Sequence, residues 1–302
     1  MKEWRTMIFD SLQRVGVLAQ NTMIQLVRMK VFYFLILFVV LVLVVAAAGL
    51  AWNPLEHVQA IKRWSFGAMY LFTMIYSISA TALLLPRDLE DRTLYTILSK
   101  PVQRIEYLAG RLLGVFAING LALLAMFLIM AILVSLNMGS VESHFLREFQ
   151  QDAQSELVTQ EEAARQMEKA RSFGVTSSLV GALWSMFLKA GVISAVTLFV
   201  STFASSTLFT IVASALMIFI GHFHQMATSY WTYEMGGNWL ALGVSKLLVI
   251  LFPNFGLFDV VDEVIQGTVL LGGQMLQITA FGLFYIFLFL LLAQLIFYDK
   301  EL

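Results

Sequence analysis

Long apolar runs alternate with short charged segments along this chain, and that alternation predicts its elements. Residues 31–51 form a run of 21 without a charged side chain, which suffices for a membrane crossing of about 20 residues. Five further apolar stretches predict spans at 64–85, 112–136, 179–203, 208–228 and 278–298. We therefore predict an all-α integral membrane protein with about six transmembrane helices.

The first 30 residues have a different pattern, with apolar or small side chains at steps of three or four. This stripe consists of Trp4, Ile8, Leu12, Val15, Ala19, Thr22 and Leu26. Such spacing forms one face of a helix. Because a span follows directly, we expect an amphipathic helix in the cytoplasmic interface, with its stripe at the acyl boundary. A soluble helix packed on a partner is the alternative.

Composition agrees with a membrane protein, because 59% of the 302 residues are hydrophobic and only 13% are charged. The net charge of −1 argues against nucleic-acid binding, which needs a basic surface. The chain has no cysteine, which excludes disulfides and thiolate metal sites. No cleavable signal sequence is expected, since the first apolar run begins only at Val31 and is longer than a signal core.

The segment 86–111 is a charged island with nine charged side chains between two predicted spans. Its bases lie close to the flanking spans, which places the segment in the cytoplasm by the positive-inside rule. We expect Asp88 to cap a short helix that ends at Leu98. Pro101 then breaks that helix before a second one leads into the next span.

The order of residues within this island resembles the first cytoplasmic loop of ABC-2 type transporter permeases. The matching positions are Glu90, Thr93, Leu94, Leu98, Ser99, Pro101, Arg104, Gly110 and Arg111. Gln103 replaces the usual small Ser, and Arg111 replaces the commoner Lys; both keep the polarity of their positions. Weaker similarity extends to residues 201–206, the Pro253–Asn254 pair and the closing residues 297–302.

The resemblance implies an ABC-2, type V exporter-like architecture. It also implies a role as the permease subunit of an ATP-driven ABC transporter that works as an exporter. Substrate would move by alternating access or lateral extrusion at a permease dimer interface. The implied partners are a cytosolic ATPase subunit, which would carry ATP and Mg, and a second permease copy or paralogue. The implied location is the cell membrane, as a multi-pass protein of the bacterial inner membrane.

Coupling to the ATPase is then expected at the cytoplasmic island. The residues assigned to it are Asp88, Leu89, Glu90, Asp91, Arg92, Thr93, Leu94, Ile97, Leu98, Pro101 and Arg104. This chain itself has no Gly-x-x-x-x-Gly-Lys-Ser/Thr phosphate loop, His-Glu-x-x-His site or Gly-x-Ser-x-Gly elbow. We therefore expect no enzyme activity, cofactor or metal in this chain.

Two other classes of function stay open. Residues 141–171 are polar and helix-prone, with seven acids against four bases, and a membrane scaffold would relay ATPase motion through them to an extracytoplasmic partner. A secondary transporter driven by an ion gradient is the third class. It predicts grouped ionisable residues in the membrane, and only Lys189 lies within a predicted span.

Three polar groups near the membrane are candidates for chemistry. Lys189 either snorkels or pairs structurally, which we favour, or faces a polar cavity. His222, His224 and Met226 suggest a copper site, but helical spacing points His224 away from the other two, so an aromatic belt is favoured. The cluster of Asp259, Asp262 and Glu263 is either a solvated helix start, which is favoured, or a site for a cation or a substrate amine.

The predicted organisation has six parts. Residues 1–30 form the interfacial helix, and 31–136 contain three spans with the loop 86–111. An extracytoplasmic helical insertion follows at 137–178, then two spans at 179–228. Residues 229–277 form an extracytoplasmic region in which 239–252 is short for a span and fits a re-entrant element. The last span and a cytoplasmic tail occupy 278–302.

Overall fold

The computed structural model describes residues 2–28, 37–42, 44, 53–90, 102–152, 165, 173–204, 206–234 and 252–298. Within these ranges the fold is helical and contains no strand. The elements are α1 (Lys2–Val27), α3 (Pro54–Glu90), α5 (Arg104–Asp152), α7 (Ser177–Phe203), α8 (Thr207–Glu234), the 3₁₀ turn η1 (Phe255–Phe258), α10 (Val261–Ile265) and α11 (Gly272–Tyr298). The all-α prediction is confirmed for this part of the chain.

Helix α7 is the centre of the bundle. It packs against α3, α5, α8 and α11, and most of its residues are buried. Small residues make this possible: a Cβ at Gly191 would lie 2.5 Å from the ring of Phe116 and 2.9 Å from Ile286. Close approach at small residues is the usual way that helices associate in membranes, and it explains why a helix rich in Ser, Ala and Gly is central.

Polar residues just before the helices fix where two of them begin. The Asn53 side chain accepts a hydrogen bond from the backbone N–H of Leu55 at 3.0 Å, and Pro54 follows at the first helical position, where its missing N–H costs nothing. At α5, Glu106 accepts from the N–H of Gln103 at 3.1 Å. This is the reciprocal half of a capping box, which ties the helix start to its third residue.

Four described helices are long and apolar enough to cross a membrane: Pro54–Leu84, Arg104–Arg147, Ser177–Phe203 and Gly272–Tyr298. They contain the predicted spans at 64–85 (save its last residue), 112–136, 179–203 and 278–298. The predicted span at 208–228 lies within α8, of which Thr207–Phe223 is a shorter apolar stretch. Most of 31–51 lies outside the described residues, so the count of six stays a prediction.

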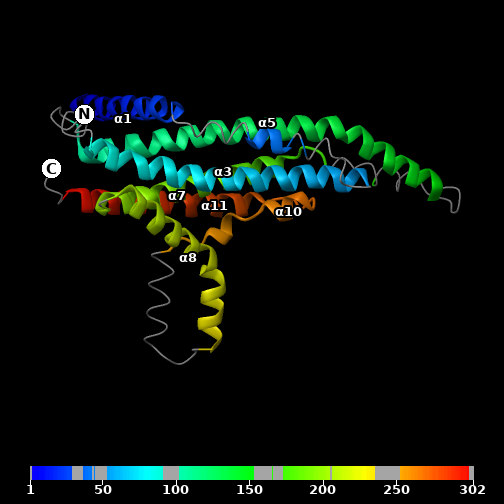
Figure 1. The fold of residues 1–302 in the computed structure, drawn as a ribbon. Helices are drawn as coiled ribbons and strands as arrows, with labels where there is room; N and C mark the ends of the chain where they lie inside the picture. Colours follow the sequence, from blue (N-terminus) through cyan, green and yellow to red (C-terminus); the bar gives the residue numbers. More distant parts are fainter. Residues whose placement is uncertain are drawn as a thin grey trace.

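Helix α1 packs against helix α5 of the same chain, a contact that the amphipathic pattern does not specify. It runs lengthwise along the first turns of α5 (Figure 1), and Thr22 and Leu26 of its predicted stripe are buried. Leu12 of the same stripe is exposed, as are Phe9 and Val17. The second half of the stripe is therefore a helix–helix contact, because glycines on α5 let the two backbones approach closely. The position of α1 in the membrane interface stays a prediction.

Two helices continue beyond the predicted boundaries. The last turn of α3 includes Asp88, so Asp88 does not begin a new helix as predicted; the helix continues through Pro86 instead. Helix α5 runs unbroken through residue 137, where the extracytoplasmic insertion was expected to begin, and reaches Asp152. The first part of that insertion is thus an extension of a membrane helix.

Figure 1 shows how the two ends of the bundle differ. The beginnings of α1 and α5 lie at the same end as the last turns of α3 and α11, which is the cytoplasmic end in the predicted topology. At the other end α5 extends past its neighbours. Helix α8 leaves the bundle near the middle of its length and turns away from it in its second half. Residues 239–251 of the predicted re-entrant stretch lie outside the described residues.

Candidate functional site

The cytoplasmic end of the bundle carries the residues that the family resemblance singled out. Asp88, Leu89 and Glu90 form the last turn of α3, and Arg104 begins α5. The residues between them that were assigned to coupling lie outside the described part of the chain: Asp91, Arg92, Thr93, Leu94, Ile97, Leu98 and Pro101. What the structure describes is therefore the attachment of this segment to the bundle.

Arg104 anchors the segment to the end of α11. Its Nη1 donates hydrogen bonds to the carbonyl oxygens of Phe297 and Tyr298, each at 2.6 Å. The guanidinium also lies 5.8 Å from the ring centroids of both residues. A helix ends with carbonyls that lack partners, and a cation there also complements the helix dipole. Arg104 thus holds α11 to the start of α5.

Glu106 anchors α5 to α1. Its Oε2 accepts from Nε of Arg14 at 2.9 Å, and its Oε1 accepts from Nη2 of Arg14 at 2.7 Å. Ser11 donates to the same carboxylate at 2.5 Å. This is a bidentate pair, the strongest form of Arg–carboxylate contact. The hydrogen bond to Glu106 raises the pKa of Arg14 above its ordinary value, so Arg14 is charged throughout the physiological range.

A third contact lies one to two turns further along α5. Arg111 is buried and donates through Nη1 to Gln25 Oε1 at 2.7 Å and Thr22 Oγ1 at 3.2 Å. Gly114 allows this approach, because a Cβ there would lie 2.5 Å from Thr22 Cβ and 2.9 Å from a backbone oxygen of α1. Helices α1, α5 and α11 are therefore joined around the exit of the 86–111 segment.

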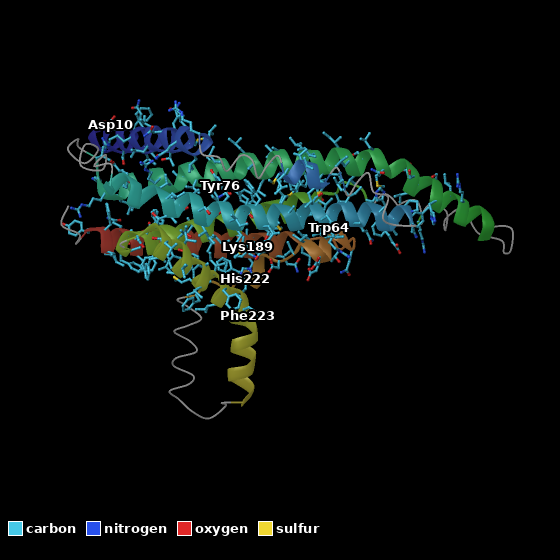
Figure 2. All side chains as sticks on the ribbon, viewed as in Figure 1. Asp10, Trp64, Tyr76, Lys189, His222 and Phe223 are labelled. Atoms are coloured by element: carbon cyan, nitrogen blue, oxygen red, sulfur yellow. The ribbon has the colours of Figure 1, made fainter. Side chains whose placement is uncertain are left out.

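A second polar group lies deeper in the bundle (Figure 2). Lys189 Nζ donates to Asp259 Oδ1 at 2.6 Å and lies 4.5 Å from the ring centroid of Tyr70. The Lys189 side chain is 3% exposed, whereas that of Asp259 is 54% exposed. Lys189 is thus paired structurally, with a partner from the turn between η1 and α10, and it also lines a cavity, so both alternatives for Lys189 describe part of its surroundings.

His222 belongs to the same group. Its Nε2 shares a hydrogen bond with the Tyr70 hydroxyl at 2.7 Å, and its Nδ1 lies 2.9 Å from the Ile218 carbonyl oxygen. Its ring stacks on Phe255. Both nitrogens are therefore engaged. No group of three metal-ligating side chains occurs among the residues that the structure describes, and the side chains of His224 and Met226 lie outside them.

Asp262 and Glu263 lie in the first turn of α10, as the favoured reading of a solvated helix start predicts. Asp259 does not share that role, because it pairs with Lys189. Sequence reasoning missed this partner, since 70 residues separate the two. It also missed Glu106, although the spacing of Gln103 and Glu106 is a capping signal and the spacing of Ser11 and Arg14 puts both on one helix face.

Comparison of the chain with protein-family models and with curated proteins gave no match.

Proposed function

We propose that this chain is the membrane permease subunit of an ATP-driven ABC transporter that exports its substrate. The proposal is carried by the residue order of 86–111, which resembles the coupling loop of ABC-2 permeases. Three anchors at the exit of that segment, Arg104, Glu106 and Arg111, support it. A coupling element needs such anchors, because force applied to a loop moves a bundle only through firm contacts.

In the proposed mechanism a separate ATPase subunit binds the 86–111 segment and moves it on ATP binding. The Arg104 contacts transmit that motion to α11, and the Glu106 and Arg111 contacts transmit it to α1. Because α7 packs against α3, α5 and α11, the displacement reaches the centre of the bundle. Opening between two permease copies then releases substrate by alternating access or lateral extrusion.

The direct test is purification of the tagged chain in a mild detergent with identification of co-purifying proteins. We expect a stoichiometric nucleotide-binding protein whose ATP turnover is sensitive to vanadate. Recovery of a folded chain alone, under conditions that preserve other complexes, would contradict the proposal and favour a gradient-driven carrier.

The coupling assignment is tested by Glu90→Lys combined with Leu94→Asp. Loss of a central interface residue costs about 2 kcal/mol or more, which is roughly thirtyfold in affinity, so stimulation of ATP turnover should be lost. Arg104 is unsuitable for this test, since its loss would also free the end of α11. Glu56→Lys reverses a charge at the opposite end of α3 and is the matched control.

One observation favours a second function, the relay of ATPase motion to an extracytoplasmic partner. Helix α5 is continuous over 49 residues, or about 73 Å at 1.5 Å per residue, whereas about 20 residues cross a membrane. A Ser140→Pro substitution kinks a helix interior. It should abolish a relay but leave substrate flux intact in a transporter, and flux under ATP turnover separates the two functions.

A further inference from the structure

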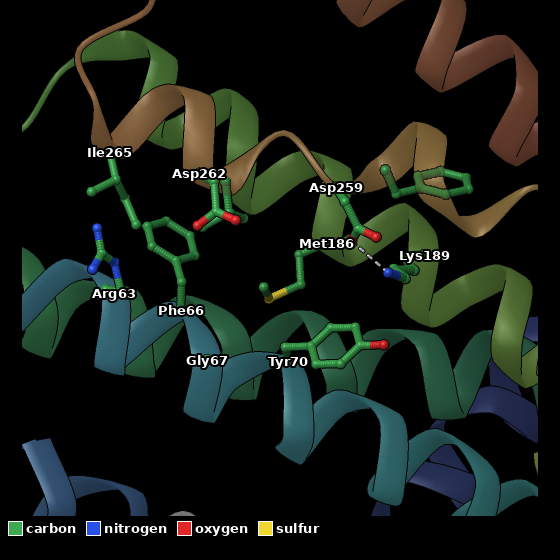
Figure 3. A pocket seen from close by; sticks show the side chains of 11 residues that line it. Arg63, Phe66, Gly67, Tyr70, Met186, Lys189, Asp259, Asp262 and Ile265 are labelled. Carbon is green, nitrogen blue, oxygen red and sulfur yellow. Dashed lines mark hydrogen bonds and ion pairs between the residues drawn. The ribbon is translucent and has the colours of Figure 1, made fainter. Parts of the chain in front are cut away.

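A cavity of about 380 Å³ lies between α3, α7 and the η1–α10 segment (Figure 3). Four charged residues line it: Arg63 from α3, Lys189 from α7, and Asp259 and Asp262 from the turn and start of α10. Its volume is near the lower end of the 300–1,000 Å³ of small-molecule sites. The cavity therefore fits a small molecule or a head group rather than a whole lipid.

The two charged side chains at the inner end of the cavity neutralise each other. Lys189 is engaged by Asp259 at 2.6 Å and by the ring of Tyr70. Because the two opposite charges are in contact, their combined field over the rest of the cavity is small. This pair forms a polar wall and does not provide a free charge for a ligand.

The other end of the cavity carries a cation and an anion that are not used in the fold. Arg63 and Asp262 are both exposed, and neither side chain has an ion-pair or hydrogen-bond partner among the described residues. Figure 3 shows Arg63 and Asp262 at the end away from Lys189, on the walls formed by α3 and α10. A ligand at this end thus meets both signs of charge.

The lining between the two ends is largely apolar and includes Phe66, Met186 and Phe258. Trp64, adjacent to Arg63, is 55% exposed, and exposed tryptophan on a membrane helix is typical of the head-group level. The charged end of the cavity therefore lies where lipid head groups are found, and the apolar lining accepts a hydrocarbon stem.

We propose that this cavity binds a zwitterionic head group that contains a primary ammonium and a phosphate, with the phosphate on Arg63 and the ammonium on Asp262. Guanidinium groups bind phosphate through paired N–H donors, and an ammonium donates charge-assisted hydrogen bonds to a carboxylate. Phosphatidylethanolamine in the membrane and a soluble phosphoethanolamine ester are two sources of this chemistry. The site does not depend on coupling to an ATPase.

The test is thermal unfolding of the full-length chain in detergent micelles, titrated with dioleoyl lipids. A ligand that binds only the folded state raises the unfolding midpoint, and at a given concentration a tighter ligand raises it more. We expect phosphatidylethanolamine to raise it more than phosphatidylcholine, whose quaternary ammonium has no N–H, and more than phosphatidylglycerol, which has no cation. A comparable rise with soluble phosphoethanolamine would support the site and identify the soluble source.

Two variants place the binding at this cavity. Asp262→Asn should lower the affinity for phosphatidylethanolamine about tenfold or more, because it removes a charged hydrogen-bond acceptor. Arg63→Gln should weaken both phosphatidylethanolamine and phosphatidylcholine. The matched controls are Glu263→Gln, a neighbouring acid that does not line the cavity, and Arg147→Gln, an exposed base at the far end of α5; both should bind as the unmodified chain does.

Equal stabilisation by the three lipids would overturn the proposal, and so would an Asp262→Asn variant that keeps its preference for phosphatidylethanolamine. Asp262 is exposed and unpaired in the described structure, so its replacement should not impair folding. The Glu263→Gln control, measured in parallel, shows whether any loss in Asp262→Asn comes from the cavity or from the start of α10.

Discussion

At the residue scale, the Lys189–Asp259 pair is asymmetric, and its two ends should respond differently to substitution. In Asp259→Asn the buried ammonium of Lys189 loses its counter-charge, which should cost about 3 kcal/mol of unfolding free energy. In Lys189→Met an apolar chain of similar length replaces the lysine, and the half-exposed Asp259 can be hydrated, so the cost should be below about 1 kcal/mol.

Thermal unfolding in detergent shows which of the two single variants loses more stability, and the double variant completes the double-mutant cycle. Lys189→Met combined with Asp259→Asn should recover most of the stability that Asp259→Asn loses, because the uncompensated charge is gone. Equal losses in the two single variants would contradict the pairing.

The Glu106 junction is a second test at this scale. Glu106→Gln keeps the shape of the side chain but loses the charge that binds Arg14 in two hydrogen bonds. We expect a loss of about 1–3 kcal/mol in unfolding free energy, together with easier proteolysis of the first 28 residues as α1 detaches. Glu263→Gln, an exposed acid at the start of α10, serves as the control and should leave both measurements unchanged.

The sequence identified residues whose role follows from their near neighbours in the chain, and it missed partners that lie far away along the chain. Lys189 is conspicuous because a charge within an apolar run needs an explanation, and the pattern alone led to that residue. Its partner Asp259 belongs to an acidic turn that local rules assign to a helix start. Contacts between residues 70 to 193 positions apart, such as Lys189–Asp259 and Arg104–Phe297, depend on how helices pack, which hydropathy does not encode.

At the element scale, the contact between α1 and α5 depends on two glycines, Gly110 and Gly114. A Cβ at either position would lie 2.5 Å from a side chain of α1, a distance that forces the helices apart. Gly114→Ala should therefore destabilise the protein by about 1–3 kcal/mol through overpacking. Gly139 lies on the same helix with nothing within 4 Å.

Gly139→Ala is the matched control for that prediction. Alanine is a better helix former than glycine by up to about 1 kcal/mol, so this variant should be neutral or more stable. Opposite signs for the two Gly→Ala changes, measured as unfolding midpoints in one detergent, would support the α1–α5 contact. Stabilisation by both would show that α1 does not pack there.

The same glycines explain why the sequence predicted α1 as a helix but not the helix against which it packs. A period of three to four is a property of any helix with one buried face, and it does not distinguish lipid from another helix as the cover. That distinction depends on whether α5 has small residues where α1 approaches it, as Gly110 and Gly114 are. By contrast, the spans of α7 and α11 were predicted to within about six residues, because hydrocarbon imposes a minimum apolar length.

At the scale of the whole molecule, the fold predicts which ends of the helices lie on the same side of the membrane. The start of α5 and the end of α11 are joined by Arg104, so Gln103 lies at the end predicted to be cytoplasmic. Gln266 follows α10, at the end where α7 and α11 begin; there the N–H of Leu270 donates to Ser178. Both glutamines are exposed.

Because the chain has no cysteine, single cysteines at these two positions report the orientation directly. Gln266→Cys should react with a membrane-impermeant maleimide in intact cells, whereas Gln103→Cys should react only after the membrane is permeabilised. Reaction of both from outside would show that α11 does not cross the membrane, since Gln266 lies near its start and Gln103 near its end, although α11 is long and apolar enough to cross. If Gln103→Cys reacted in intact cells and Gln266→Cys only after permeabilisation, the orientation from the positive-inside rule would be inverted. The 86–111 segment would then lie outside the cytosol, where a cytosolic ATPase could not bind it.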